Sequence, residues 1–184
     1  WTAATDYSGE LAISKEILKR VTERYRRLRN TLRFLLANLS DFNPLEDAVP
    51  QDQMVELDRY ALILARRLQE KLAGDYYPRY AFHFAVQDIV HFCSEDLGAF
   101  YLDILKDRLY TTQANSHARR SAQTALYHIT RSLVLLISPI LCFTAEEAWD
   151  IIGGGEEDSV LFHTLHEFPT MPEASEIALV AKWE

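Results

Sequence analysis

Near the start of the chain, apolar residues recur every three or four positions, the spacing of one face of an α-helix. The series is Ile13, Ile17, Val21, Tyr25, Leu28, Leu32, Leu35 and Leu39. Ser14 stands at its beginning, where a serine side chain can accept a hydrogen bond from the first helical turn. We therefore predict a helix from about residue 14 to residue 38, preceded by an extended lead-in over residues 1–12.

Helical spacing continues after a proline-containing loop at residues 40–51. A second apolar series ends at Leu72, and we expect Gly74 to end that helix because glycine favours the C-terminal cap. A third helical region is predicted from about Tyr76. Ser94 is followed by two acidic residues, a pattern typical of a helix start, so we expect the helix to restart there.

The last part of the chain carries one more long helical pattern, over residues 116–140. Thr144 is followed by two glutamates, a capping box for a short helix that the glycines at 153–155 end. Residues 159–169 have an extended composition. Long helices with short loops predict an all-α fold, an antiparallel helical bundle with a short extended C-terminal segment.

The composition fits one globular domain. The chain has 184 residues, of which 48% are hydrophobic and 25% charged, values typical of a soluble domain with its own core. We expect residues 1–169 to form this domain and residues 170–184 to be a linker or the start of a following region. The chain begins at Trp1 and ends in mid-pattern, so we expect a piece of a longer protein. The longest apolar run is too short to span a membrane.

The cysteines and histidines predict no metal site. Cys93 and Cys142 stand in apolar helical stretches without CxxC spacing, so we expect two buried thiols and no disulfide. His83 and His91 lie eight residues apart, about 12 Å along a helix axis, which is too far to share one ion. Packed or surface histidines are therefore the simpler interpretation.

Charge separates the first helix from the rest of the chain. Residues 15–33 hold eight of the 19 basic residues against two carboxylates, a net charge of +6. Because the whole chain carries −8, the remainder carries −14. Such an imbalance suggests a polyanionic partner for this one helix rather than a generally basic protein. From charge alone, a phosphate-contacting face and a solvated surface helix fit the pattern about equally well.

Helical geometry separates these cations into a far stripe and a flank. Opposite the apolar face lie Lys15, Lys19, Arg26, Arg29, Arg33 and Asn30. On the flank, Glu16 and Glu23 precede Arg20 and Arg27 by four residues, which favours intrahelical ion pairs. We expect those pairs to neutralise the flank in part, whereas the far stripe has fewer partners.

Two further pairs of basic residues are ambiguous in sequence. Lys106 and Arg108 stand near a predicted helix end and either form a second basic contact or stay within the fold. Arg119 and Arg120 open a helix, where positive charge is unfavourable. For this second pair we expect internal carboxylates as partners.

Several blocks of the sequence, in order, resemble bacterial isoleucyl-tRNA synthetases, which are class I aminoacyl-tRNA synthetases. The blocks are DYSGELAIS, YRRLRNTLRFLLANL, ELDRYAL, FCSEDLGAFYLDILKDRLYT, RRSAQTALYHI and SPILCFTAEEAW. The resemblance is to the helical anticodon-binding domain that follows the catalytic core. It extends from Trp1 to about Pro169.

This resemblance implies function. The family's full-length enzymes join isoleucine to its tRNA with ATP and magnesium in the cytoplasm, and many bacterial members carry a C-terminal zinc module. The family's catalytic signatures, His-Ile-Gly-His and Lys-Met-Ser-Lys-Ser, are absent from this chain. The resemblance thus implies a part of a ligase that binds the anticodon stem and loop, is inactive alone and needs no cofactor of its own. Its partners would be isoleucine tRNA and the catalytic core and C-terminal module of the same protein.

The resemblance also gives the basic residues a role. Lys15, Lys19, Arg26, Arg29 and Arg33, with Lys106 and Arg108, are expected to contact phosphates, and Asn30 either phosphates or a base. Two alternatives remain: a spacer bundle that reads no anticodon, and a bundle that binds acidic proteins. A spacer has no need for an unpaired basic stripe. A catalytic or metal-binding bundle is disfavoured because the Glu-x-x-His pattern is missing.

Overall fold

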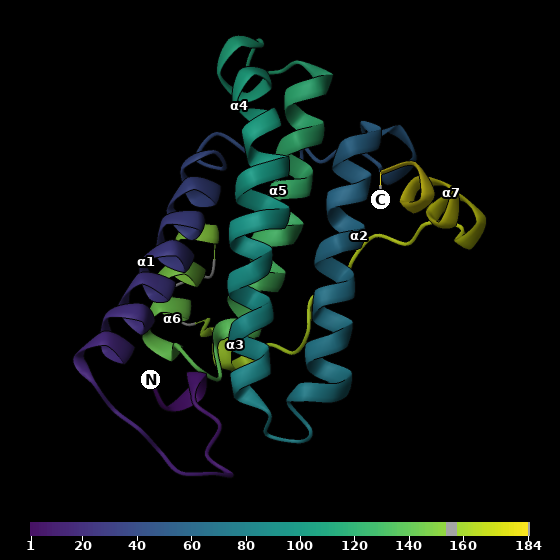
Figure 1. Ribbon diagram of the computed structural model, residues 1–184. Coiled ribbons are helices and arrows are strands. Elements are labelled where there is room, and N and C mark those ends of the chain that lie inside the picture. Colours follow the sequence, from purple (N-terminus) through teal and green to yellow (C-terminus); the bar gives the residue numbers. More distant parts are fainter. Residues whose placement is uncertain (154–157, 184) are drawn as a thin grey trace.

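The computed structural model describes residues 1–153 and 158–183, and these fold into a bundle of helices (Figure 1). The long helices lie side by side and run in alternating directions along the bundle. In chain order the α-helices are α1 (Lys15–Ala37), α2 (Glu56–Lys71), α3 (Phe82–His91), α4 (Leu102–Thr111), α5 (His117–Ile137), α6 (Cys142–Ile152) and α7 (Glu173–Trp183). The all-α antiparallel bundle predicted from the sequence is confirmed, and no strand occurs in the part of the chain described.

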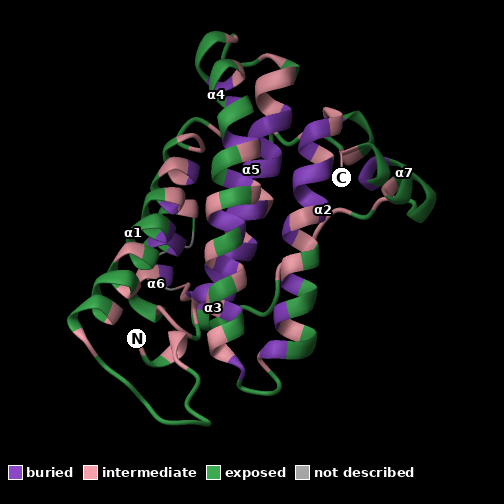
Figure 2. Ribbon diagram, in the orientation of Figure 1, coloured by how far each residue is buried: buried purple, intermediate pink, exposed green. Residues whose placement is uncertain are grey.

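Helix α5 lies at the centre of the core. Its Leu126, Ile129, Leu133 and Leu136 are fully buried and meet apolar side chains of α1, α2, α4 and α6. Figure 2 shows that buried residues follow the sides on which the rods meet. None of the helices within 1–153 and 158–183 is both long and apolar enough to cross a membrane.

Local capping signals correctly placed several helix ends. The Ser14 hydroxyl accepts a hydrogen bond from the Ile17 amide at 3.2 Å, and Ser116 caps α5 in the same way through the Arg119 amide. Gly153 ends α6 with a φ of 111°, a left-handed conformation that glycine adopts without a steric penalty. The predictions at Ser14 and Gly153 held because each depends on residues within one helical turn.

The predicted stop at Gly74 is wrong. Helix α2 continues as a π-helical segment, η3 (Leu72–Tyr76), and the chain turns only at Tyr77 to Tyr80. Helix α3 then begins at Phe82, later than predicted. Burial of Leu72 and Tyr76 in the core favours continuation of the helix, which outweighs the modest cost of one glycine inside it.

The predicted restart at Ser94 is also wrong. Helices α3 and α4 are the two ends of one rod, joined by a π-helical segment, η4 (Phe92–Tyr101). Gly98 lies inside this segment, where an added Cβ atom would come within 2.9 Å of the Cys93 carbonyl oxygen. The close backbone approach explains why a glycine occupies this position, and Ser94 caps nothing.

The predicted capping box at Thr144 is not formed. Helix α6 already begins at Cys142, so Thr144 lies in its first turn and its hydroxyl meets the Tyr25 hydroxyl of α1 at 3.2 Å. Glu146 instead accepts hydrogen bonds from the Ser159 hydroxyl and the Val160 amide. The glutamate therefore fastens the C-terminal segment to α6. The glycines at 154 and 155 lie outside the described residues.

The C-terminal segment is largely irregular, as its composition indicated, with a short 3-10 turn at Val160–Phe162. Gln69 of α2 holds this segment against the bundle through two hydrogen bonds. Its side chain donates to the His166 carbonyl at 2.8 Å and accepts from the His166 amide at 3.2 Å. Further on, α7 packs on α2: Trp183 stacks on Tyr60 with ring centroids 6.0 Å apart. A domain boundary at residue 169 stays a prediction.

Candidate nucleic-acid interface

Helix α1 lies at one edge of the bundle and is only partly buried (Figure 2). Its second half inserts Leu28, Leu32 and Leu35 into the core. Its first half does not follow the predicted apolar face, because Ile13 precedes the helix and is 64% exposed, and Tyr25 is 39% exposed. Most residues of this half are exposed, so most of the helix circumference is open to solvent there.

The far stripe lies on the solvent side of α1, as its spacing predicted. All six of its residues are exposed members of one helix: Lys15, Lys19, Arg26, Arg29, Asn30 and Arg33. Within residues 1–153 and 158–183, the two lysines, Arg29 and Arg33 have no ion-pair partner. Their charges are therefore available to an external anion.

Glu23 pairs differently from the prediction. It binds Arg26, a member of the far stripe, at 2.7 Å, and Arg27 has no ion pair in the part of the chain that the structure describes. Both partners of this pair are exposed, so its energy is small and it can open to admit another anion. The flank is consequently less neutralised than expected.

The flank forms an open groove between α1 and α3. Lys19, Arg20, Arg24 and Arg27 line it, together with both glutamates of α1 and Val90 of α3, around a volume of about 570 Å³. Charged side chains make up all but one member of its wall. A groove of this chemistry suits phosphates rather than apolar groups.

A second, smaller groove lies between α1 and α6. Arg29 and Arg33 form one wall, and Thr144, Glu147 and Ile151 of α6 form the other, around about 70 Å³. The floor is apolar and consists of Leu32, Leu36 and Ala148. This groove combines cations, a carboxylate and an apolar floor in one place, although its two walls are more than a hundred residues apart in sequence.

The structure separates the second basic pair from α1. Lys106 lies on α4, at the end of the bundle away from the start of α1 (Figure 1), and pairs with Asp103 at 2.8 Å on the exposed surface. Asp103 raises the pKa of Lys106 because the ion pair favours the charged amine. Lys106 stays reachable by an anion, but it does not extend the stripe.

Arg108 is held inside the fold. Its guanidinium binds both carboxylate oxygens of Asp58, which is fully buried, at 3.0 and 2.5 Å. Tyr101 and Ser121 donate to the same carboxylate at 2.8 and 2.5 Å. Burial beside this carboxylate raises the pKa of Tyr101 well above its usual value. The four side chains join α2, η4, α4 and α5, so the Arg108 charge is already satisfied within the core.

Arg119 and Arg120 have internal partners, as predicted. Arg119 binds Asp41 at 3.0 Å, and Arg120 binds Asp47 at 3.3 Å. Both carboxylates belong to the loop that follows α1. The pair thus anchors this loop to the start of α5 and contributes no free charge.

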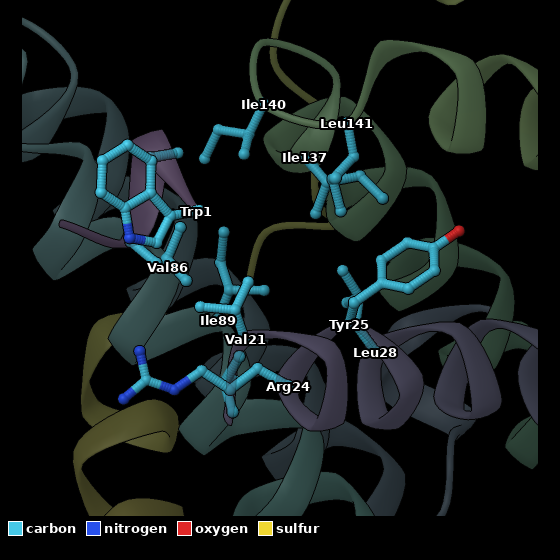
Figure 3. Close-up of a pocket in the computed structure, with 13 residues that line it drawn as sticks. Trp1, Val21, Arg24, Tyr25, Leu28, Val86, Ile89, Ile137, Ile140 and Leu141 are labelled. Atoms are coloured by element: carbon cyan, nitrogen blue, oxygen red, sulfur yellow. The ribbon is translucent and has the colours of Figure 1, made fainter. Parts of the chain in front are cut away.

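An apolar cavity of about 90 Å³ lies at the end of the bundle near the N-terminus. Figure 3 shows Trp1 on one side, Tyr25 on the other, and Ile140 among the side chains between them. Arg24 is the charged residue of the lining, and its guanidinium points away from the cavity. The lining offers nothing that would bind a polyanion.

The thiols and histidines do not assemble a metal site in the described part of the chain, where no three metal-ligating side chains cluster. Cys93 is buried, and burial raises its pKa to about 12. Cys142, predicted to be buried, is instead exposed because it lies on the outer side of the first turn of α6. The Nδ1 atom of His128 lies 2.8 Å from the Nε2 atom of His166. The two residues are 38 positions apart, and no pattern in the sequence predicted this contact.

Comparison with known proteins assigns the chain to a family. A family model described as the anticodon-binding domain of tRNA ligase matches residues 58–183. The chain belongs to this family. Helix α1 precedes the matched residues, but alignments with individual relatives cover it.

Those relatives align along the whole of this anticodon-binding domain. The chain is 84% identical to an isoleucine–tRNA ligase of Neisseria gonorrhoeae over 183 residues. It is 65% identical to the isoleucine–tRNA ligase of Chromobacterium violaceum and 64% identical to that of Laribacter hongkongensis. The alignments cover 100% of this chain but only 19–20% of each relative. The chain therefore spans about a fifth of the length of the curated relatives it matches.

Proposed function

We propose that this domain binds the anticodon stem and loop of isoleucine tRNA, as part of an isoleucine–tRNA ligase. The relatives named isoleucine–tRNA ligase support the choice of amino acid. ATP and magnesium would serve the catalytic part of the ligase, with zinc in a C-terminal module, and this chain would supply the RNA-binding surface in the cytoplasm.

The unpaired cations of α1 carry this proposal. Among the residues that the structure describes, no carboxylate pairs with Lys15, Lys19, Arg29 or Arg33 on the exposed stripe, and the chain is acidic elsewhere. Because phosphate contacts release counterions, each contacting arginine contributes about one unit to the slope of log K against log salt. Asn30 lies within the stripe and can donate to a phosphate or a base. Lys106 is a separate candidate contact, and the internal pairing of Arg108 makes it the weakest member of the predicted set.

The test compares paired and unpaired arginines on the same helix. In a titration with isoleucine tRNA transcript at several salt concentrations, Arg29→Ala/Arg33→Ala should lower the salt slope by about two. Arg26→Ala should lower it less, because Arg26 is already paired with Glu23. Arg79→Ala is the control, since it removes an exposed arginine that is bound to Asp75 and lies outside α1, in the turn before α3.

An unchanged slope in the double variant would contradict the proposal. It would favour the spacer interpretation, in which α1 contacts no RNA. Circular dichroism should show the same helicity in all variants, because these side chains are exposed and their removal leaves no buried group unpaired.

A further inference from the structure

The two grooves beside α1 differ in the chemistry that they offer. The groove toward α3 is lined almost entirely by charge. The groove toward α6 has arginines on one wall and a floor of Leu32, Leu36 and Ala148. A phosphate fits the first kind of surface, whereas a nucleobase needs an apolar surface for its face and a polar group for its edge.

Exposed side chains with unused binding capacity lie in and beside the α1–α6 groove. Glu147 and Ile151 line it, whereas Phe143 lies outside the lining, one helical turn before Glu147. Phe143 is 89% exposed and Ile151 is 62% exposed, although both belong to a helix whose other side is buried. Glu147 is exposed and, among the described residues, has neither an ion pair nor a hydrogen bond. Residues 143, 147 and 151 follow one another at four-residue steps, which places them on one side of α6.

We propose that the α1–α6 groove receives one unstacked base of a single-stranded RNA loop. This inference rests on the proposed function and names the part of the RNA that the groove binds. Phe143 at the rim stacks on the base, while Arg29 and Arg33 bind the flanking phosphates. The Glu147 carboxylate accepts a hydrogen bond from an amino group on the edge of the base.

Charge complementarity selects RNA as the occupant. Arg29 and Arg33 line the groove and have no ion-pair partner within residues 1–153 and 158–183. They belong to a helix segment of net charge +6. An acidic peptide would also suit the two arginines, but Glu147 on the opposite wall would repel it. A nucleotide satisfies both walls, because its phosphate is an anion and its base carries hydrogen-bond donors.

Glu147 gives the groove a preference among bases. A carboxylate only accepts hydrogen bonds, so it favours cytosine, whose N4 amino group is a donor. Uracil differs by a carbonyl oxygen at the same position, and that oxygen would repel the carboxylate. The groove should therefore favour cytosine over uracil at one loop position by about tenfold, the discrimination typical of one good base contact.

The experiment measures binding of this chain to the anticodon hairpin of isoleucine tRNA, with each loop position changed in turn to cytidine and to uridine. The wild-type chain should prefer cytidine at one position. Glu147→Gln should abolish that preference, because an amide can pair with either base, and should leave the salt slope unchanged. Phe143→Ala should weaken binding about tenfold whichever base is present, as loss of one stacking partner does.

Matched controls remove the same chemistry outside the groove. Phe162→Ala removes another highly exposed phenylalanine, 78% exposed, and Asp150→Asn removes an exposed carboxylate of α6 that does not line the groove. Both should bind as the wild type does. Wild-type behaviour of Phe143→Ala and Glu147→Gln, with a reduced salt slope in Arg29→Ala/Arg33→Ala, would overturn the groove and leave the proposed function standing. Absence of binding by the wild-type chain would overturn both.

Discussion

Replacing Arg108 with alanine should lower the free energy of unfolding by about 3–5 kcal/mol, the usual cost of removing one partner of a buried ion pair. The Asp58 carboxylate would stay fully buried with only two neutral donors, Tyr101 and Ser121. Arg108 donates two of the four hydrogen bonds that the Asp58 carboxylate accepts, and among the described residues it is the only positively charged group bound to that carboxylate. The free energy of unfolding of a domain is typically about 5–15 kcal/mol in total. The variant should therefore stay folded, with a markedly lower free energy of unfolding.

Urea unfolding followed by circular dichroism measures this loss. With a slope on the order of 2 kcal/mol/M, the midpoint should fall by about 2 M. Lys106→Ala is the control, since Lys106 forms an exposed ion pair on the same helix, and its midpoint should stay within error of the wild type.

A second substitution tests the physical reason for the loss. If the cost comes from a buried unpaired charge, Asp58→Asn in the Arg108→Ala background should recover stability rather than reduce it further. A loss below about 0.5 kcal/mol in Arg108→Ala, or additive losses in the double variant, would refute the buried-pair interpretation. Arg108 would then be open to the RNA-contact role that its sequence also allowed.

Two further predictions concern pH and glycine. Burial depresses the pKa of His128 to about 4 and that of His166 to about 3, below the ordinary value of 6.5. As the pH falls below 6.5, these two histidines therefore bind protons in the unfolded chain before they do so in the folded chain. The free energy of unfolding should fall as the pH drops from 6.5 toward 3. His128→Gln/His166→Gln should unfold with a shallower pH dependence in that range, and an identical dependence would contradict the shifts. Gly98→Ala should lower the free energy of unfolding by about 1–3 kcal/mol, because the added Cβ would lie 2.9 Å from the Cys93 carbonyl oxygen. Gly74→Ala, with open space around the added Cβ, should raise it by about 0.4–1 kcal/mol. Equal urea midpoints for the two variants would rule out this difference.

Local signals predicted much of the fold. The cap at Ser14 and the stop at Gly153 depend on a few neighbouring residues, and both were correct. The failures at Gly74 and Ser94 have one cause: burial of apolar side chains favoured a continuous helix over a local break signal. The prediction at Thr144 failed for a different reason: α6 begins two residues earlier, at Cys142, so Thr144 lies inside its first turn.

The binding surface was predictable only in part. Helical periodicity placed the far stripe of α1 on one exposed face, and composition showed that its charge was unusual. The partner of Arg108 lies 50 residues away in sequence, so no local pattern could distinguish its internal pairing from the exposed pairing of Lys106. The choice of Glu23 between Arg26 and Arg27 depends on side-chain rotamers. The groove between Arg29 and Glu147 exists only once α1 and α6 pack together.

The central claim is that this domain binds the anticodon stem and loop of isoleucine tRNA through the basic face of α1. A salt-dependent titration of the chain with isoleucine tRNA transcript, and with the same transcript carrying an altered anticodon, tests it most directly. The account predicts tighter binding to the isoleucine anticodon and a steep loss of affinity with salt. Failure to bind either transcript at low salt would contradict it.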